Sequence, residues 1–521
     1  MNTNQVLQIL FNKFKRSFFQ NFRKMNYHKP MKEFLELYKD FNLGKLTTES
    51  FHDDTKNLSF VAQENLPQAI KKLSNVDDQA LEHLIPKLEE IFELSETIHS
   101  VLRAGKKVFL CGCGATGRLS IALETFWRRM NPGNDQVVSF MAGGDYALVK
   151  SVESFEDNSS FGARQLKELG HQQGDLFIGV TEGGETSFVI GATIEASKSG
   201  DTWFLYCNPD SELSGISRSR RVLENKSVNK LNLSVGPMAI SGSTRMQAST
   251  VQMLALSFAL FFPEKEIKKF KQKAFEEINN LKKLDAQFLS TFIELEEQVY
   301  KGKGHVNYLS NAANAITILT DTTERSPTFN LIPFEQSSLG PRSLSFLTIA
   351  GEPASESAWN SILNRTPRGL NWQDLPRKLD LDEIYQFDFS NKVLDRRPGE
   401  VFKVLGDECS FSFEFRNAAF NLRLPSDEFV INQIALKMLM NIHSTLVMCR
   451  MDRVYGNMMT YVRPSNYKLV DRATRYVLEI ASRQNVELDY LTVATDIIER
   501  SGNQKGEKSV VLESLDLFLN K

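Results

Sequence analysis

Three segments of this 521-residue chain follow one pattern: an apolar strand, a loop rich in glycine or hydroxyl side chains, and a helix. They span residues 106–130, 174–200 and 231–250. Repeated units of this kind predict a parallel α/β sheet, which binds its ligand at the carboxyl ends of the strands. Helix N-termini at that edge attract anions. The pattern therefore predicts a site for a phosphate monoester carried by a small molecule.

The loops of these segments supply the candidate ligand-binding residues. The helix of the first segment is expected to open near Arg118. In the third segment the alternative is simple N-capping, since Ser and Thr are preferred at that position. The candidates are Gly114, Ala115 and Thr116 in the first loop, Thr181, Gly183 and Thr186 in the second, and Ser243, next to Thr244, in the third.

The first loop also spells GxGxxG, with Gly112, Gly114 and Gly117. A dinucleotide site of this type needs an acidic residue at the end of the next strand, about 20 residues on. The nearest acid, Asp145, lies late and inside a glycine turn of its own. We therefore regard a nicotinamide site as the weaker alternative.

Composition limits the other classes of function. A formal charge of −2 gives no reason to expect nucleic-acid binding, and 41% hydrophobic residues suit a globular protein with a large core. The five cysteines form no CxxC pair, and the seven histidines show no metal-ligand spacing. No apolar run reaches the length of a membrane span. We expect a cytoplasmic protein with no metal, no cofactor and no membrane span.

Four ordered motifs carry a family resemblance: GCGATGRL, AGGDYALVKSVESFED, SGSTRM and VYGNMMTYVRPSNYKLVDRA. Together they resemble the family built on the sugar isomerase (SIS) domain that includes N-acetylmuramic acid 6-phosphate etherase and the glucokinase regulatory protein. The resemblance extends from about residue 45 to residue 485. It implies a flavodoxin-like αβα sandwich that binds a sugar phosphate.

A second copy of the domain is expected from His305 onward. The segment DTTERSPTF, which contains Glu324, resembles the DASECxPTF segment of the family, but SNAANA has replaced the glycine loop. We predict an α/β protein with two tandem SIS domains and a helical C-terminal cap. The expected parts are a basic N-terminal extension (1–44), the first SIS domain with the ligand site (45–262), a helical connector (263–303), a degenerate second SIS domain (304–455) and the cap (456–521). The extension is interpreted as an added segment, with a membrane-surface helix or a presequence as alternatives.

The etherase reaction needs a general acid and a general base, and the resemblance implies two glutamates. One matches Glu156. The other falls on Phe126 in the first copy, and Glu124 lies about 200° away around the same helix. The matching Glu324 lies in the second copy, so neither copy holds the whole pair. This distribution favours binding over catalysis, although a site shared between the copies would restore the pair.

The resemblance implies that Thr116 contacts phosphate, that Glu156 meets sugar hydroxyls, and that Lys468 reaches the phosphate from the cap. Asn466 is expected to cap the helix that holds Lys468. The sequence thus predicts a regulatory protein of the glucokinase-regulator type that binds a hexose 6-phosphate such as fructose 6-phosphate, with a sugar kinase as a candidate partner. The alternative is N-acetylmuramic acid 6-phosphate etherase, a lyase, with Glu156 as a catalytic residue. An aldose–ketose isomerase is a third hypothesis, weakened by the lack of a histidine near the loops.

Overall fold

The computed structural model describes Tyr38 and residues 43–152, 155–407, 409–464, 466–503 and 508–519. The chain divides into two compact units. The larger one is Lys45–Tyr461, and the smaller one combines Met1–Gly44 with Val462–Lys521. Most of the N-terminal extension, and with it the interpretation of that segment, lies outside the described residues.

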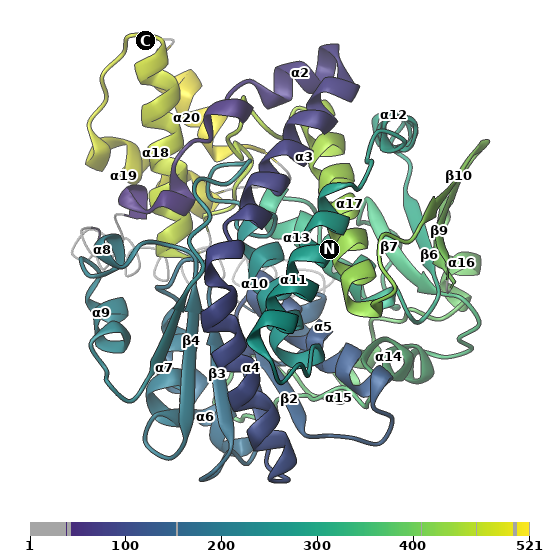
Figure 1. The fold of residues 1–521 in the computed structure, drawn as a ribbon. Helices are drawn as coiled ribbons and strands as arrows, with labels where there is room; N and C mark the ends of the chain where they lie inside the picture. Colours follow the sequence, from purple (N-terminus) through teal and green to yellow (C-terminus); the bar gives the residue numbers. More distant parts are fainter. Residues whose placement is uncertain are drawn as a thin grey trace, which may run out of the picture. The chain divides into compact units, whose positions relative to one another are not determined.

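The first sheet of the larger unit has five parallel strands in the order β2-β1-β3-β4-β5. This is the flavodoxin-like order, in which strand order reverses between β1 and β3. The strands β1 to β3 are buried along their whole length because helices lie on both sides of the sheet (Figure 1). The predicted αβα sandwich is confirmed. The strands are β1 (Val108–Gly112), β2 (Val137–Met141), β3 (Leu176–Val180), β4 (Asp201–Tyr206) and β5 (Asn229–Asn232).

Two helices on this sheet pack with unusual closeness. A Cβ at Gly162 would lie 2.0 Å from the carbonyl oxygen of Phe188, and one at Gly191 would lie 1.9 Å from that of Ser159, so only glycine fits. These contacts join α6 and α7. The helices of this half are α2 (Leu58–Glu64), α3 (Leu66–Glu82), α4 (Leu88–Arg103), α5 (Ala115–Met130), α6 (Ser159–Glu168), α7 (Ser187–Ala196), α8 (Asp210–Leu213), α9 (Ser217–Leu223) and α10 (Gln247–Phe261).

The second sheet has the order β10-β9-β8-β6-β7. The three strands that come first in the sequence, β6, β7 and β8, are parallel and repeat the arrangement of β1, β2 and β3. This agrees with a second SIS copy. The last two strands instead form antiparallel hairpins, with no helix in the described residues between β8 and β10. An antiparallel edge tolerates solvent on one face. The strands are β6 (Val306–Ser310), β7 (Ser345–Ile349), β8 (Glu400–Gly406), β9 (Ser410–Phe415) and β10 (Ala418–Arg423).

The two copies meet mainly through helices. Helices α5 and α10 of the first copy contact α13 (Ala315–Phe329) and α17 (Phe429–Arg450) of the second, and α2 and α3 also pack against α17. Helix α17 is almost fully buried, and it carries several polar side chains into the core between the copies besides its apolar ones. Two amphipathic helices, α11 (Ile267–Lys282) and α12 (Leu289–Lys301), occupy the segment expected to be a helical connector. The remaining helices of this half are α14 (Ser355–Leu363), α15 (Leu381–Tyr385) and α16 (Lys392–Arg396).

The smaller unit is helical where it is described, with α18 (Tyr467–Arg483), α19 (Tyr490–Asn503) and α20 (Val510–Leu519). The predicted N-cap is confirmed, because the Asn466 side chain accepts a hydrogen bond from the Leu469 N–H at 2.9 Å. Lys468 therefore lies in the first turn of α18. None of the helices in the described ranges is long and apolar enough to span a membrane.

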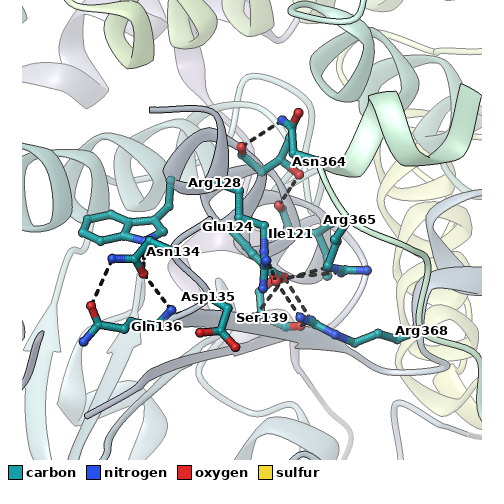
Figure 2. Close-up of polar contacts among 12 residues, drawn as sticks. Ile121, Glu124, Arg128, Asn134, Asp135, Gln136, Ser139, Asn364, Arg365 and Arg368 are labelled. Atoms are coloured by element: carbon teal, nitrogen blue, oxygen red, sulfur yellow. Dashed lines mark hydrogen bonds and ion pairs between the residues drawn. The ribbon is translucent and has the colours of Figure 1, made fainter. Parts of the chain in front are cut away.

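A buried carboxylate fixes a segment of the second copy against the first sheet. Glu124 on α5 accepts hydrogen bonds from Ser139 Oγ on β2 at 2.6 Å and from Arg368 Nη2 at 2.6 Å. Arg365 Nε adds a third bond at 3.1 Å (Figure 2). Burial alone would raise the pKa of Glu124, but the guanidiniums of Arg365 and Arg368 hold that pKa well below its ordinary value. Glu124 is thus a structural residue, which agrees with its expected place away from the position of Phe126.

We expect Glu124→Gln to lower the free energy of unfolding by about 3–5 kcal/mol, because it removes the negative charge that the guanidiniums of Arg128, Arg365 and Arg368 share. Thermal unfolding at pH 7 measures the loss. Since the folded-state pKa of Glu124 is depressed, the contribution is present at neutral pH and fades as the pH falls below the ordinary glutamate range. The control is Glu266→Gln, at an exposed pair with Lys269. An equal loss in both variants would contradict the structural role of Glu124.

Candidate functional site

The first and second predicted loops meet at the topological switch point of the first sheet. They follow β1 and β3, which are adjacent strands, and their helices leave toward different neighbours in the strand order. In open α/β sheets this crevice is where ligands bind. The structure therefore brings Gly114, Ala115 and Thr116 next to the loop that contains Thr181, Gly183 and Thr186.

The first loop is built tightly on its glycines. A Cβ at Gly112 would lie 2.3 Å from the backbone carbon of Thr116, and Gly114 has φ 56°, a conformation that favours glycine. Helix α5 begins at Ala115, earlier than the expected start near Arg118, and Gly114 provides no side-chain cap. The amides at this helix start are thus available to an anion.

Thr116 has a role in the loop that sequence reasoning did not anticipate. Its Oγ1 accepts from the Cys113 N–H and donates to the Cys113 carbonyl oxygen, both at 2.9 Å. The side chain is buried, with 1% of its surface exposed. Thr116 therefore holds the turn closed, which shapes the ring of amides that faces the site.

The second loop is also closed by its own hydroxyls. Thr181 Oγ1 accepts from the Gly184 N–H at 3.2 Å and lies 3.1 Å from Thr186 Oγ1. Asn208 Nδ2 donates to the Gly183 carbonyl oxygen at 3.1 Å, which ties this loop to the end of β4. All three candidate residues of the loop are buried, so they define the loop's shape.

The third loop runs into α10, and the N-capping interpretation is wrong for it. Helix α10 begins at Gln247 after Met246, and no described side chain caps it. Ser243 and Thr244 lie in the turn before the helix. The helix itself reaches the second loop, because Gln252 Nε2 donates to the Thr181 carbonyl oxygen at 3.1 Å.

Three further candidate residues have different surroundings. Glu156 is half-buried, and its carbonyl oxygen accepts from the Phe188 N–H at 3.0 Å, so it lies beside the start of α7. Its neighbour Glu153 lies outside the described residues. Asp145 is bonded to Arg365 Nη1 at 2.5 Å and to the Arg368 N–H at 2.6 Å, so its carboxylate is not available to a ribose. Lys468 belongs to the smaller unit, and its approach to the phosphate stays a prediction.

The contact between the two copies adds a carboxyl group to the first loop. Glu324 on α13 lines a narrow cavity together with Ala115 and Ser249 of the first copy. The cavity has a volume of about 10 Å³, room for about one water molecule. Glu324 is 4% exposed, and within the described part of the chain its Oε1 has no hydrogen-bond partner. Burial raises the pKa of Glu324, although the Arg118 guanidinium opposes the rise.

Lys437 on α17 lines the same cavity, and sequence reasoning missed it. Its Nζ donates to the Arg245 carbonyl oxygen at 2.9 Å and to Thr250 Oγ1 at 2.8 Å, which holds the third loop and the start of α10. Burial lowers the pKa of Lys437 to about 8, although the Glu324 carboxyl opposes this shift. A lysine inside an apolar helix was the only available signal in the sequence.

The reverse arrangement, in which the first copy would supply a glutamate to the loop of the second copy, is blocked. Phe126 is fully buried, and its ring packs edge-on against Phe429 at 5.5 Å. The SNAANA loop of the second copy is tied down by its own neighbours, since Asn311 Nδ2 donates to the Gly406 carbonyl oxygen at 2.7 Å. The intact first loop therefore faces a glutamate, and the degenerate loop does not. The glutamate that matches the family motif therefore lies at the first loop, as a site shared between the copies would require.

Comparison with known proteins agrees with this fold. Residues 92–197 match the family described as the glucokinase regulatory protein N-terminal SIS domain. The chain is 33% identical over 218 residues to the N-acetylmuramic acid 6-phosphate etherase of Clostridium acetobutylicum, covering 42% of this chain and 68% of that enzyme. It is 31% identical over 222 residues to the etherase of Klebsiella aerogenes, with coverage of 42% and 68%.

Solved structures give a more distant likeness. The C-terminal domain of glucosamine-fructose-6-phosphate aminotransferase from Francisella tularensis is 12% identical, with a TM-score of 0.40 over 73% of this chain and 94% of that one. The etherase relatives carry the assignment, because the match exceeds 30% identity and covers two thirds of their length. The chain belongs to the SIS-domain family of the N-acetylmuramic acid 6-phosphate etherases and the glucokinase regulatory protein.

Proposed function

We propose that each chain binds one hexose 6-phosphate at the switch point of the first sheet. The phosphate would lie over the amides at the start of α5, where Gly114 and Ala115 offer an uncapped helix terminus. Thr181 and Thr186 would shape the wall on the other side, with Ser243 in the loop before α10. The observation that carries the proposal is that Glu324 of the second copy lines one cavity with Ala115 of this loop.

We further propose that the site acts as a carbon–oxygen lyase of the etherase type. Cleavage of a lactyl ether needs an acid at the departing oxygen and a base at the sugar C2 proton. Glu324 suits the acid, because burial raises its pKa and keeps a proton on the carboxyl at higher pH. Glu156 is the second carboxylate implied by the resemblance and is assigned as the base. Lys437 positions the third loop and supplies positive charge beside Glu324.

The relatives support this choice, because the matched proteins of Clostridium acetobutylicum and Klebsiella aerogenes are N-acetylmuramic acid 6-phosphate etherases. In this proposal the second copy supplies Glu324 in place of the glutamate expected at Phe126. Glu156 and Glu324 would then act as the pair at one site, although neither copy holds both.

A regulatory sugar-phosphate binder is the second candidate. The match of residues 92–197 to the regulatory protein's SIS domain supports it. In that case fructose 6-phosphate is the candidate ligand, Lys468 would reach its phosphate, and a sugar kinase would be the partner. Both candidates use the same loop site, so turnover separates them.

The first test is incubation of the full chain with N-acetylmuramic acid 6-phosphate. We expect D-lactate to be released, and Glu324→Gln to slow the release by roughly 10²–10⁴-fold, because a general acid is lost. Glu276→Gln, on the exposed face of α11, is the matched control. Binding of hexose 6-phosphates without any lactate release would select the regulatory candidate. Release that survives Glu324→Gln would contradict the shared site.

The second test concerns the first loop. Thr116→Val removes both hydrogen bonds to Cys113, each worth about 1–3 kcal/mol when its buried partner is left unpaired. We expect the affinity for fructose 6-phosphate and N-acetylglucosamine 6-phosphate in calorimetry to fall roughly ten- to a hundredfold. Thr125→Val is the control, since this buried hydroxyl donates within α5, to the Ile121 carbonyl oxygen. Equal affinities in the two variants would show that the loop does not hold the phosphate.

A further inference from the structure

A second cavity lies at the edge of the first sheet. It opens between the edge strand β2, helix α6 and residues 368–372 of the second copy. Its volume is about 370 Å³, within the range of about 300–1,000 Å³ that is typical of small-molecule sites. The residues that line it include none of the phosphate-loop candidates and neither Glu324 nor Lys437.

The walls of this edge cavity are fixed by bonds made elsewhere. Arg368 reaches past the cavity to Glu124 and to the Ser139 carbonyl oxygen, which it meets at 2.9 Å (Figure 2). On the α6 side, Trp372 Nε1 donates to Glu168 Oε2 at 2.6 Å. The cavity is thus held open by hydrogen bonds from both copies.

The charges around the cavity cancel. The lining includes two arginines, Arg164 and Arg368, and two acids, Asp145 and Glu168. Arg164 Nε pairs with Glu168 at 3.0 Å, Arg368 pairs with Glu124, and Asp145 pairs with Arg365. An added ionic group would have to be desolvated without a free counter-charge, which is costly. The cavity therefore favours a neutral guest and disfavours a phosphate.

One polar side chain in the wall lacks its partner. Gln165 on α6 is 4% exposed, and in the ranges that the structure describes its Oε1 accepts no hydrogen bond. A buried amide oxygen without a partner costs about 1–3 kcal/mol. A carboxamide offers a donor and an acceptor side by side, so it suits a hydroxyl group, which can accept and donate.

Phe140 and Trp372 are the aromatic residues that line the cavity, and the surroundings of Trp372 give further information on the guest. Trp372 is stacked on Phe155 at 5.7 Å and lies under the Arg164 guanidinium at 4.0 Å. An aromatic ligand such as a nucleobase, which would stack on a free face of Trp372, is thus a poor fit. Apolar groups of Leu169 and Leu370 complete the lining beside the polar ones. A compact ring with hydroxyl groups on its rim and C–H groups on its faces matches this mixture.

We propose that the edge cavity binds a neutral, unphosphorylated monosaccharide, with Gln165 as its hydrogen-bonding anchor. This site would be separate from the phosphosugar loops. It stands whether or not the proposed lyase activity does, because it uses different residues.

The test is calorimetry on the full chain with N-acetylglucosamine and with glucose, in the presence of saturating fructose 6-phosphate to occupy the loop site. We expect at least one of the two neutral sugars to bind, and Gln165→Leu to weaken its binding by about tenfold or more. The matched control is Gln173→Leu, the same change at an exposed glutamine of the same domain. It should bind as the wild type does.

Hydrogen exchange on the wild type provides an independent measurement. The neutral sugar should protect residues 164–169 and 368–372, and leave residues 181–186 unchanged. Failure of both sugars to bind, protection confined to residues 181–186, or equal affinity in Gln165→Leu and Gln173→Leu would each overturn the proposal. Since Gln165→Leu removes a buried unpaired group, its thermal unfolding should confirm that it remains folded.

Discussion

The larger unit depends on a buried ionic contact between its two SIS copies. Arg245, in the third loop of the first copy, pairs with Asp321 on α13 at 3.1 Å. Asp321 also pairs with Arg325 at 2.9 Å, and Arg325 pairs with Glu296 on α12 at 2.7 Å. All four side chains are buried, and such charges are tolerated only when fully paired. The contact therefore fixes the loop before α10 against α13, and α13 against α12.

This fixed contact makes the loop site a joint product of the two copies. The first copy has the glycines, the uncapped start of α5 and the hydroxyl-closed loops, and the second copy brings Glu324 and Lys437. The reverse combination is blocked, because Phe126 fills the position of a glutamate and Asn311 anchors a loop without glycines. In the proposed function one chain therefore has one sugar-phosphate site, although it contains the domain twice.

Much of the fold could be predicted from the sequence because its signals are local. The apolar strands, the glycine turns and the helix capped by Asn466 are each determined by neighbours along the chain. The antiparallel strands β9 and β10 were not predicted, because their alternating pattern matches other short strands equally well. Their pairing depends on contacts made only in the folded sheet.

The candidate site was predictable only in part. The residues of the first and second loops are predictable, because glycine and threonine between an apolar strand and a helix are typical of a loop that binds an anion. The hydrogen bonds by which Thr116 holds the first loop closed are not predictable, because they depend on the backbone conformation at Cys113. The sequence indicates that Glu324 matches a family glutamate, but it does not place Glu324 beside Ala115, because that proximity comes from helix packing between residues more than 200 positions apart in the sequence. Lys437 lies outside the recognised motifs, and the spacing of residues in its helix does not indicate a functional role.

The central claim is that one sugar-phosphate site forms from both copies. A crystal structure of the full chain with N-acetylglucosamine 6-phosphate tests it most directly. We predict one sugar per chain, its phosphate on the amides of Ala115 and Thr116, and the Glu324 carboxyl within hydrogen-bonding distance of the sugar. A sugar bound at residues 310–315, or one at the first loop that contacts only first-copy residues, would contradict the account.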